Sequence, residues 1–427
     1  MTANTTKNTL LDNFCGLIPK PTGFVWDNMP FSVFRRKDGS VRTTFDPKAY
    51  DLPRAVTRYV NGEIGNDASD GLSEATAWKT LRYAITTLIA LNPTSAKIVL
   101  LSRGGYKNGW GNAISPTFPI SLISKYGDSI ISVMNGDDFT LHSGTCYKAT
   151  TSTSNIFDLM WIDETGCPRK LNAVGSISEC VATLGSAYDA GTDLYINLFN
   201  GRKPDHNVHC IYSGWSPSMS ADFYCEGVSF VATSQNFITT ASNLKCIFNK
   251  CRFIGSTRDA LDITSNGSFF AMIDCACLAH GGDGFSWHGT GIKVLEDNCF
   301  VSGIGGYSDG DNNSTMHNTG VVVRVGGTYL GGIGVARNVH DINACLSWNV
   351  GCYSKCGSYA GDPNGNPAWA SGSMTTSGET SKMWLDDCYA SGSGYWFGVY
   401  GDGSSMKFRT FTPTRGTKYG SDKMSTY

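Results

Sequence analysis

The chain of 427 residues is long enough for two to three average domains or for one long repetitive domain. It holds 50 glycines, 41% hydrophobic residues and only 16% charged residues, a balance that excludes a disordered chain. The net charge of −2 gives no field to attract nucleic acid, and no run of 18 apolar residues is long enough to span a bilayer. We therefore expect neither a nucleic-acid partner nor membrane insertion.

The first 57 residues mix aromatic and basic residues without a clear period, and they lack the pattern of a secretory signal. A helix over about 74–92 is predicted by apolar residues that recur on one face, namely Trp78, Leu81, Ile85 and Leu88. Ser73 is its expected N-cap and Pro93 closes it. The next apolar run, residues 98–101, predicts a short buried strand.

Fifteen cysteines in a chain without a secretory signal predict reduced thiols in the core rather than disulfides. Cys345, Cys352 and Cys356 follow a C-x6-C-x3-C pattern, which lacks the tight paired spacing of zinc modules. We therefore expect no metal site and no cofactor.

Five cysteines open similar phrases, and their spacings indicate a repeated unit. CRFIG, CLAHG, CFVSG, CLSWN and CYASG begin at residues 251, 277, 299, 345 and 388, at intervals of 26, 22, 46 and 43. A unit of about 22–26 residues, rich in strands, predicts a solenoid of parallel β-coils whose stacking supplies the core. On this register Cys277 and Cys299 should stack on neighbouring coils, and the helix should cover the first open coil.

A second alignment supports the same period without gaps. DALDITSNG (259–267), DGFSWHGTG (283–291) and NNSTMHNTG (312–320) form three consecutive rows. Because side chains alternate along a strand, the apolar columns should point inward, namely Leu261/Phe285 and Ile263/Trp287/Met316. The alternate columns should point outward, namely Asp262/Ser286/Thr315 and Thr264/His288/His317. Asp386-Asp387, before the last cysteine phrase, is expected to end a coil.

The passage YVNGEIGNDASDGLSEATAWKTLRYAI and the phrases GGDGFSWHG and DGDNNSTMHNTGVVVRVGG resemble the right-handed parallel β-helix proteins of phage tailspikes and related polysaccharide-degrading enzymes. The resemblance implies an all-β fold, a right-handed parallel β-helix (β-solenoid) over residues 58–400 with a capping α-helix. It leaves a short N-terminal attachment or neck region at 1–57 and a short C-terminal tail at 401–427.

The same resemblance implies a role. Tailspikes bind and usually cleave bacterial surface glycans such as capsule or O-antigen, and they assemble as homotrimers. It thus implies localisation in the virion, as part of the phage tail, after synthesis in the host cytoplasm, with other tail or baseplate proteins as partners. A long, weakly charged, aromatic-rich solenoid also favours a trimer, because it exposes more apolar area than a monomer usually tolerates.

An inserted loop marks a candidate catalytic region. The glycine spacing grows from 24 residues between the first and second rows to 29 between the second and third, which places extra residues in GYSDGD at 306–311. Glycoside hydrolysis needs two carboxyl groups, so Asp283 with Asp309 or Asp311 is the predicted pair of an endo-glycosidase. Asp283 begins its row, where such residues also stabilise turns.

The outward histidines belong to the same region and leave a second chemistry open. A polysaccharide lyase would use His288 or His317 as its base and Arg324 or Lys293 to stabilise developing charge. The expected substrate-binding residues are Tyr307, Asp262, Lys293, Arg324 and Trp287. Hydrolysis is favoured because acids outnumber bases there, and a receptor-binding tail fibre without catalysis remains the third alternative.

Overall fold

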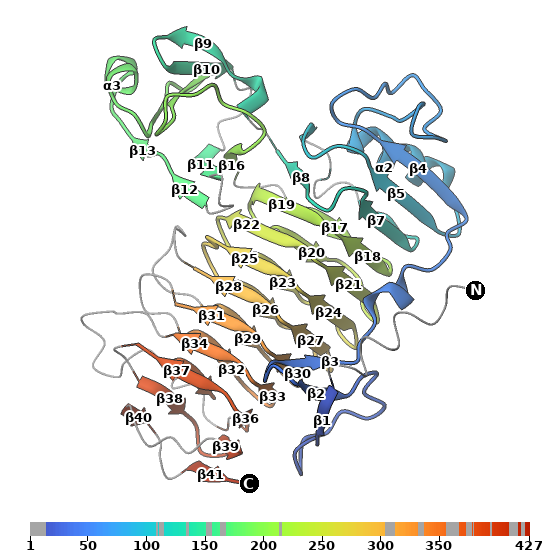
Figure 1. Ribbon diagram of the computed structural model, residues 1–427, viewed down its shortest axis with the longest axis vertical. Helices are drawn as coiled ribbons and strands as arrows, with labels where there is room; N and C mark the ends of the chain where they lie inside the picture. The colour runs from blue at the N-terminus through green and yellow to red at the C-terminus, as the bar shows by residue number, and fades with distance from the viewer. Residues whose placement is uncertain are drawn as a thin grey trace.

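The structure is a computed structural model in which three long parallel sheets run side by side (Figure 1). It describes residues 14–107, 110, 115–133, 136–150, 156–162, 168–212, 216–303, 312–331, 337–355, 367–372, 378, 380–392, 395–409, 417–419 and 423–427. Among these, every helix falls short of the length and hydropathy that a membrane crossing requires.

Sheets 1, 2 and 3 are named in the order in which each coil visits them. In the described residues, sheet 1 has twelve strands, β4 (Val56–Val60), β5 (Ala96–Leu100), β7 (Ile120–Ser124), β18 (Phe223–Glu226), β21 (Lys245–Asn249), β24 (Phe269–Ile273), β27 (Lys293–Asp297), β30 (Val321–Val325), β33 (Leu346–Val350), β36 (Lys382–Asp386), β39 (Ser405–Arg409) and β41 (Met424–Thr426). Sheet 2 has nine, β6 (Tyr106–Lys107), β8 (Ser129–Ser132), β19 (Val228–Thr233), β22 (Arg252–Ser256), β25 (Ala276–Leu278), β28 (Phe300–Ser302), β31 (Thr328–Leu330), β34 (Tyr353–Lys355) and β37 (Tyr389–Ser391). Sheet 3 has nine, β17 (Ser218–Met219), β20 (Phe237–Thr239), β23 (Leu261–Ile263), β26 (Phe285–Trp287), β29 (Ser314–Met316), β32 (Val339–Asp341), β35 (Trp369–Ser371), β38 (Tyr395–Val399) and β40 (Thr417–Tyr419).

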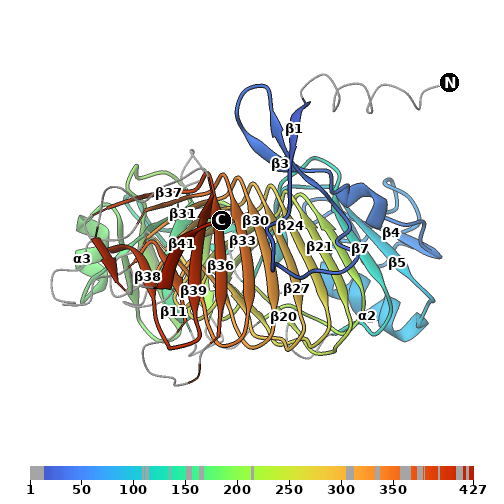
Figure 2. The same ribbon diagram turned by 90° about the horizontal axis from the view of Figure 1, so that it is seen from below.

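The order of these strands is that of a solenoid. From β18 to β36, each strand pairs in parallel with the strand three places further along the chain, so one coil lies on the next. The coils appear edge-on as successive loops in Figure 2. Their inner faces form one continuous buried cluster that extends from Val60 to Phe408. The all-β, solenoid-like fold predicted from the repeats is confirmed.

The cysteine ladder exists in a different register from the predicted one. Cys251, Cys275 and Cys299 each lie one residue before a sheet 2 strand on three consecutive coils. Cys277 pairs instead with Val301, so the expectation that it stacks on Cys299 is wrong by two residues. A shift of two residues returns a side chain to the same face, so the two registers predict the same burial.

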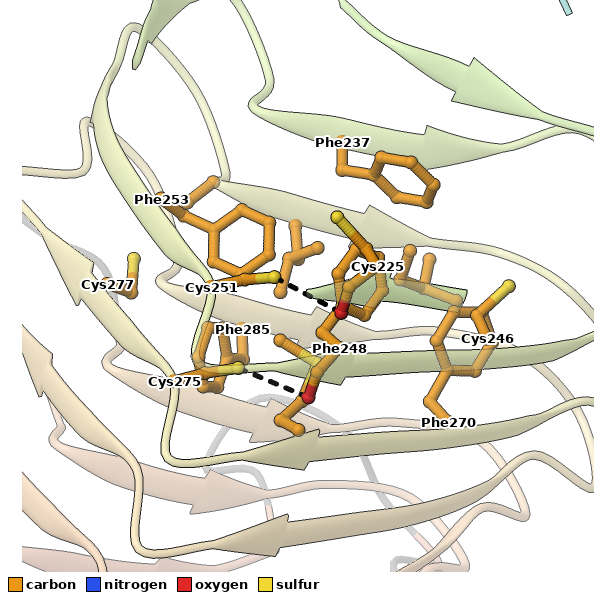
Figure 3. Packing of buried hydrophobic residues seen from close by; sticks show 14 of the residues in the cluster. Cys225, Phe237, Cys246, Phe248, Cys251, Phe253, Phe270, Cys275, Cys277 and Phe285 are labelled. Carbon is orange, nitrogen blue, oxygen red and sulfur yellow. Dashed lines mark hydrogen bonds between the residues drawn. The ribbon is translucent and has the colours of Figure 1, made fainter. Parts of the chain in front are cut away.

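The thiols pack inside the coils, as predicted. The thirteen described cysteines are all free, and all of them except Cys15 are buried. In Figure 3, the Cys251 thiol donates to the carbonyl of Cys225 at 3.5 Å and the Cys275 thiol to that of Phe248 at 3.4 Å. Each of these weak hydrogen bonds joins a coil to the one before it.

A turn between sheets 1 and 2 repeats along the stack and needs residues with positive φ. Four such residues have φ between 49° and 57°, namely Lys250, Asp274, Asn298 and Asp387. Glycines fill the same place in three other coils, Gly227, Gly326 and Gly351, because glycine adopts this conformation without steric cost. Asp386 is the last residue of β36 and Asp387 lies in the turn to β37, so the pair ends a strand of sheet 1 and not, as was predicted, a coil.

The helix α2 (Leu81–Leu91) covers the first coil, but it begins later than predicted. Its buried residues, Leu81, Ala84, Ile85 and Leu88, join the core of the solenoid. Thr80 is the N-cap, with its hydroxyl accepting from the Tyr83 amide at 3.2 Å, so the assignment of Ser73 was wrong. Asp67 explains the late start, because its carboxylate binds the amides of Lys79 and Thr80 at 2.8 and 2.9 Å and holds the preceding segment in a turn.

The N-terminal region lies along the outer face of sheet 1. Its antiparallel sheet comprises β1 (Phe14–Ile18), β2 (Val33–Arg36) and β3 (Val41–Thr43), and the short 3-10 helix η1 (Pro47–Tyr50) follows. Phe24 packs on Trp348 and Trp384 of the solenoid, and Trp26 packs on Phe269. Arg42 pairs with Asp297 and with Asp274, both at 2.9 Å. The region is therefore docked on the solenoid.

A separate unit interrupts the solenoid between β8 and β17, which the predicted continuous β-helix over 58–400 did not include. It is built from η2 (Gly136–Asp138), β9 (Thr140–Ser143), β10 (Cys146–Thr150), β11 (Ile156–Ile162), β12 (Pro168–Lys170), β13 (Asn172–Ala173), α3 (Ile177–Ala182), β14 (Ser186–Asp189), β15 (Asp193–Asn197) and β16 (Val208–Tyr212). Its pairs are antiparallel except β13 with β14, and it projects from one end of the stack (Figure 1). Met160 and Ile211 fix it to the outer face of sheet 2.

The predicted C-terminal tail also belongs to the solenoid. β39 and β41 extend sheet 1, and β40 extends sheet 3. The boundary at residue 400 was therefore placed too early, because the glycine-rich segments between these short strands conceal the repeat.

His209, on β16 of the inserted unit, is fully buried, and neither ring nitrogen has a hydrogen-bond partner within the described chain. Burial, with a smaller contribution from His206, lowers the pKa of His209 from 6.5 to about 3. In the folded protein the His209 ring is therefore neutral at pH 7.

We expect His209 to make the folded state less stable in acid. Because its folded pKa lies below the unfolded value, its stabilisation is complete above pH 6.5 and is lost as pH falls toward 3. His209→Met should remove this dependence, so the difference in unfolding free energy between wild type and variant should change by about 2 kcal/mol from pH 6.5 to 4.5. Denaturant unfolding at both pH values measures this difference in unfolding free energy. A difference that does not vary with pH would contradict the burial of His209 as a neutral ring.

Candidate active site

The three predicted rows stack on sheet 3 in the predicted register. Leu261 pairs with Phe285, and Ile263 with Trp287, which pairs in turn with Met316. All five are fully buried, as their predicted inward orientation requires. The outward positions bring Asp262 beside Ser286 and place His288 and His317 one residue beyond the ends of adjacent strands.

His288 and His317 form a stacked pair on this outer face. Their ring centroids are 4.0 Å apart and their planes differ by 26°. Burial, with a smaller contribution from His288, lowers the pKa of His317 to about 3, so that ring is neutral at pH 7. His317 is therefore neither a proton donor nor a base matched to neutral pH.

Ser286 lies beside His288 in an arrangement that first suggests a serine nucleophile. Its hydroxyl oxygen is 2.7 Å from His288 Nε2, and it donates to Asp283 Oδ2 at 3.2 Å. The hydroxyl is fully buried, so a substrate does not reach it. Ser286 therefore orients His288 rather than attacking a substrate.

Two carboxylates and His288 lie close together in this region. One ligand atom each from Asp259, Asp262 and His288 lies within 4.8 Å of the other two, and all three residues are half-buried. Burial raises the pKa of Asp259, and the charge of Asp262 adds to this, against opposing effects of the Asp283 amide and His288. Asp262 Oδ2 accepts from Gln235 at 2.6 Å. The same donor types suit a divalent cation.

Asp283, a predicted catalytic acid, has a structural role. Its Oδ1 accepts from the backbone and side-chain nitrogens of Asn312 at 2.6 and 3.1 Å. Asp259 Oδ1 accepts the Asp283 amide in the same way at 2.9 Å. These side chains start successive rows and join each row to the next, which is the turn role that the sequence also allowed.

Three predicted substrate-binding residues lie elsewhere. Trp287 is fully buried and donates to Glu296 at 2.9 Å. Arg324 is also fully buried and donates to Asp341 at 2.9 Å, because it sits on the inward side of β30. Lys293 begins β27 on the outer face of sheet 1, between Phe269 and Val321, and so lies on another face from the histidines.

The remaining predictions concern the inserted loop. Tyr307, Asp309 and Asp311 lie outside the described residues. Asp259 was not predicted as a site residue, although it opens the first of the three rows and stands three residues before Asp262. That spacing, next to an outward histidine on the following row, was the signal available in the sequence.

Neither family models nor curated protein sequences match this chain. A solved structure titled "Glycoside hydrolase" is 11% identical, with a TM-score of 0.42, over 87% of this chain and 97% of that one. The GH136 lacto-N-biosidase from Eubacterium ramulus is 10% identical, with a TM-score of 0.36, over 87% of this chain and 68% of its own. Both likenesses are too loose to assign a role to any residue here.

Proposed function

We propose that this protein hydrolyses glycosidic bonds within a bacterial surface polysaccharide, with Asp259 as the acid and Asp262 as the second carboxylate. The supporting observation is the pair of half-buried carboxyl groups on the outer face of the coils, with oxygens within 4.8 Å of each other. Glycosidases need two such groups at a scissile bond, one able to donate a proton and one ionised. The raised pKa of Asp259 fits the donor.

The short separation favours retention of configuration. Carboxyl groups roughly 5–5.5 Å apart suit direct attack by one of them, whereas inversion needs roughly 6.5–9.5 Å to admit a water molecule. Asp259 then protonates the leaving oxygen while Asp262 bonds to the anomeric carbon. Water displaces Asp262 in the second step and gives its proton to Asp259, which restores both groups.

Incubation of the purified protein with capsule or O-antigen tests the proposal. Hydrolysis produces new reducing ends without ultraviolet-absorbing double bonds, and proton NMR of the first product should show the anomeric configuration of the substrate. Unsaturated uronates among the products would show that the protein is a lyase. Glycan binding without any product would show that it is a receptor-binding fibre.

The lyase alternative has one observation in its favour. Asp259, Asp262 and His288 have the donor types of a divalent-cation site, and a cation could neutralise a uronate carboxylate while a base removes the adjacent proton. Loss of cleavage on adding EDTA, restored by Mn²⁺ or Ca²⁺, together with unsaturated products, would support it.

The tailspike assignment is part of the same proposal, with right-handed coils, as nearly all parallel β crossovers are. We expect a homotrimer in a virion tail, attached to other tail or baseplate proteins. Sedimentation of the purified chain in dilute buffer should give a particle of three chains, and a monomer would contradict the assembly.

A further inference from the structure

A cavity of about 290 Å³ lies where the segment after η1 crosses the outer face of sheet 1. Tyr50, Leu52 and Arg54 form one wall, while Asp222, Lys245 and Ile247 come from the coils of β18 and β21. The candidate active site lies on sheet 3, so this cavity is separate from it.

The cavity contains two cations, Arg54 and Lys245, and the charges of Asp51 and Asp222 act on Arg54. Arg54 donates from Nε to the Ser121 hydroxyl at 3.1 Å, which leaves its two terminal nitrogens. Within the described residues, neither Arg54 nor Lys245 forms an ion pair. The one carboxylate in the lining, Asp222, already accepts the Lys245 amide at 2.9 Å. The lining therefore has net positive charge and a free guanidinium fork suited to a carboxylate.

The apolar part of the lining suits the apolar face of a sugar ring. Tyr50 is half-buried, and its ring is fixed by stacking on Phe45, with centroids 5.3 Å apart and planes 25° apart. Leu52 and Ile247 add apolar surface. An inorganic anion would gain nothing from these groups, and the volume, at the lower edge of the roughly 300–1,000 Å³ usual for ligand sites, matches one ring.

We propose that this cavity binds a carboxylate-bearing sugar unit, with Arg54 and Lys245 at the carboxylate and Tyr50 against the ring. The site is a second point of glycan contact, independent of the cleavage proposed above, and it requires the N-terminal region to be docked on the solenoid.

Titration of the full chain with glucuronate, glucose and inorganic phosphate, followed by NMR or calorimetry, tests the proposal. Glucuronate should bind with a Kd on the order of 1 mM, and the other two at least tenfold more weakly. Arg54→Gln/Lys245→Gln should weaken glucuronate binding at least tenfold, whereas the matched surface variant Lys37→Gln/Arg82→Gln should not. Tyr50→Leu should weaken glucuronate binding and leave any phosphate binding unchanged.

Two results would overturn the proposal. Equal binding of phosphate and glucuronate would mean a general anion site, and unchanged glucuronate binding in Arg54→Gln/Lys245→Gln would place the sugar elsewhere. Cleavage by Arg54→Gln/Lys245→Gln reports on sheet 3 alone, so this site and the proposed hydrolysis can fail separately.

Discussion

Replacing Asp259 by asparagine should lower the rate of glycan cleavage by about 10²–10⁴-fold, the range that general acid–base catalysis contributes. The amide retains an oxygen that can accept the Asp283 amide, now bound at 2.9 Å, so the link between rows survives. What the variant loses is the proton. Initial rates of reducing-end formation, with glycan binding measured separately, check this result.

The pH dependence of the cleavage rate distinguishes a catalytic role of Asp259 from a structural one. An acid catalyst must be protonated, so wild-type activity should fall as pH rises through the raised pKa of Asp259. Asp259→Asn should lose that limb of the profile, and the matched surface variant Asp27→Asn should retain both rate and profile. If Asp259→Asn cleaves at the wild-type rate, the acid lies elsewhere.

Replacing Arg324 by methionine should lower the free energy of unfolding by about 3–5 kcal/mol. Arg324 is fully buried between Asp341, at 2.9 Å, and Glu296, at 3.6 Å. Burial alone would lower the pKa of Arg324, but these two carboxylates raise it overall. Without the guanidinium, two carboxylates remain in the core with no cation to compensate them.

The matched control removes the whole charge network. Arg324→Met combined with Glu296→Gln and Asp341→Asn leaves no unpaired buried charge, so it should recover part of the lost stability. Urea unfolding of the wild type, the single variant and the triple variant measures both effects. A single variant as stable as the wild type would mean that water reaches the two carboxylates.

The sequence predicted most where a repeat could be aligned. The aligned rows alone predicted that Leu261, Phe285 and Trp287 point inward and Asp262 outward, because side chains alternate strictly along a strand once the register is known. The cysteine phrases alone predicted correctly that these thiols face inward, but in an incorrect register. Residues two apart on a strand face the same side, so the shift changes neither their orientation nor their burial.

Other features left no pattern to detect. Arg324 was predicted to stabilise developing charge at the site, but it is buried against Glu296, one coil earlier on β27, and against Asp341 on β32 of its own coil. The unit between β8 and β17 interrupts the repeat without a marked change in composition. The raised pKa of Asp259 depends on burial and on groups from two rows, and neither can be derived from residue types in order.

The docked N-terminal region imposes an order on folding. Arg35 pairs with Asp387, 352 residues further along, and Phe24 packs against Trp384. Since synthesis proceeds from the N-terminus, Phe24 and Arg35 must wait until Trp384 and Asp387 have been made before they reach these partners. During that interval the outer face of sheet 1 is uncovered, so nascent chains should be most vulnerable to association just before Trp384 and Asp387 are made.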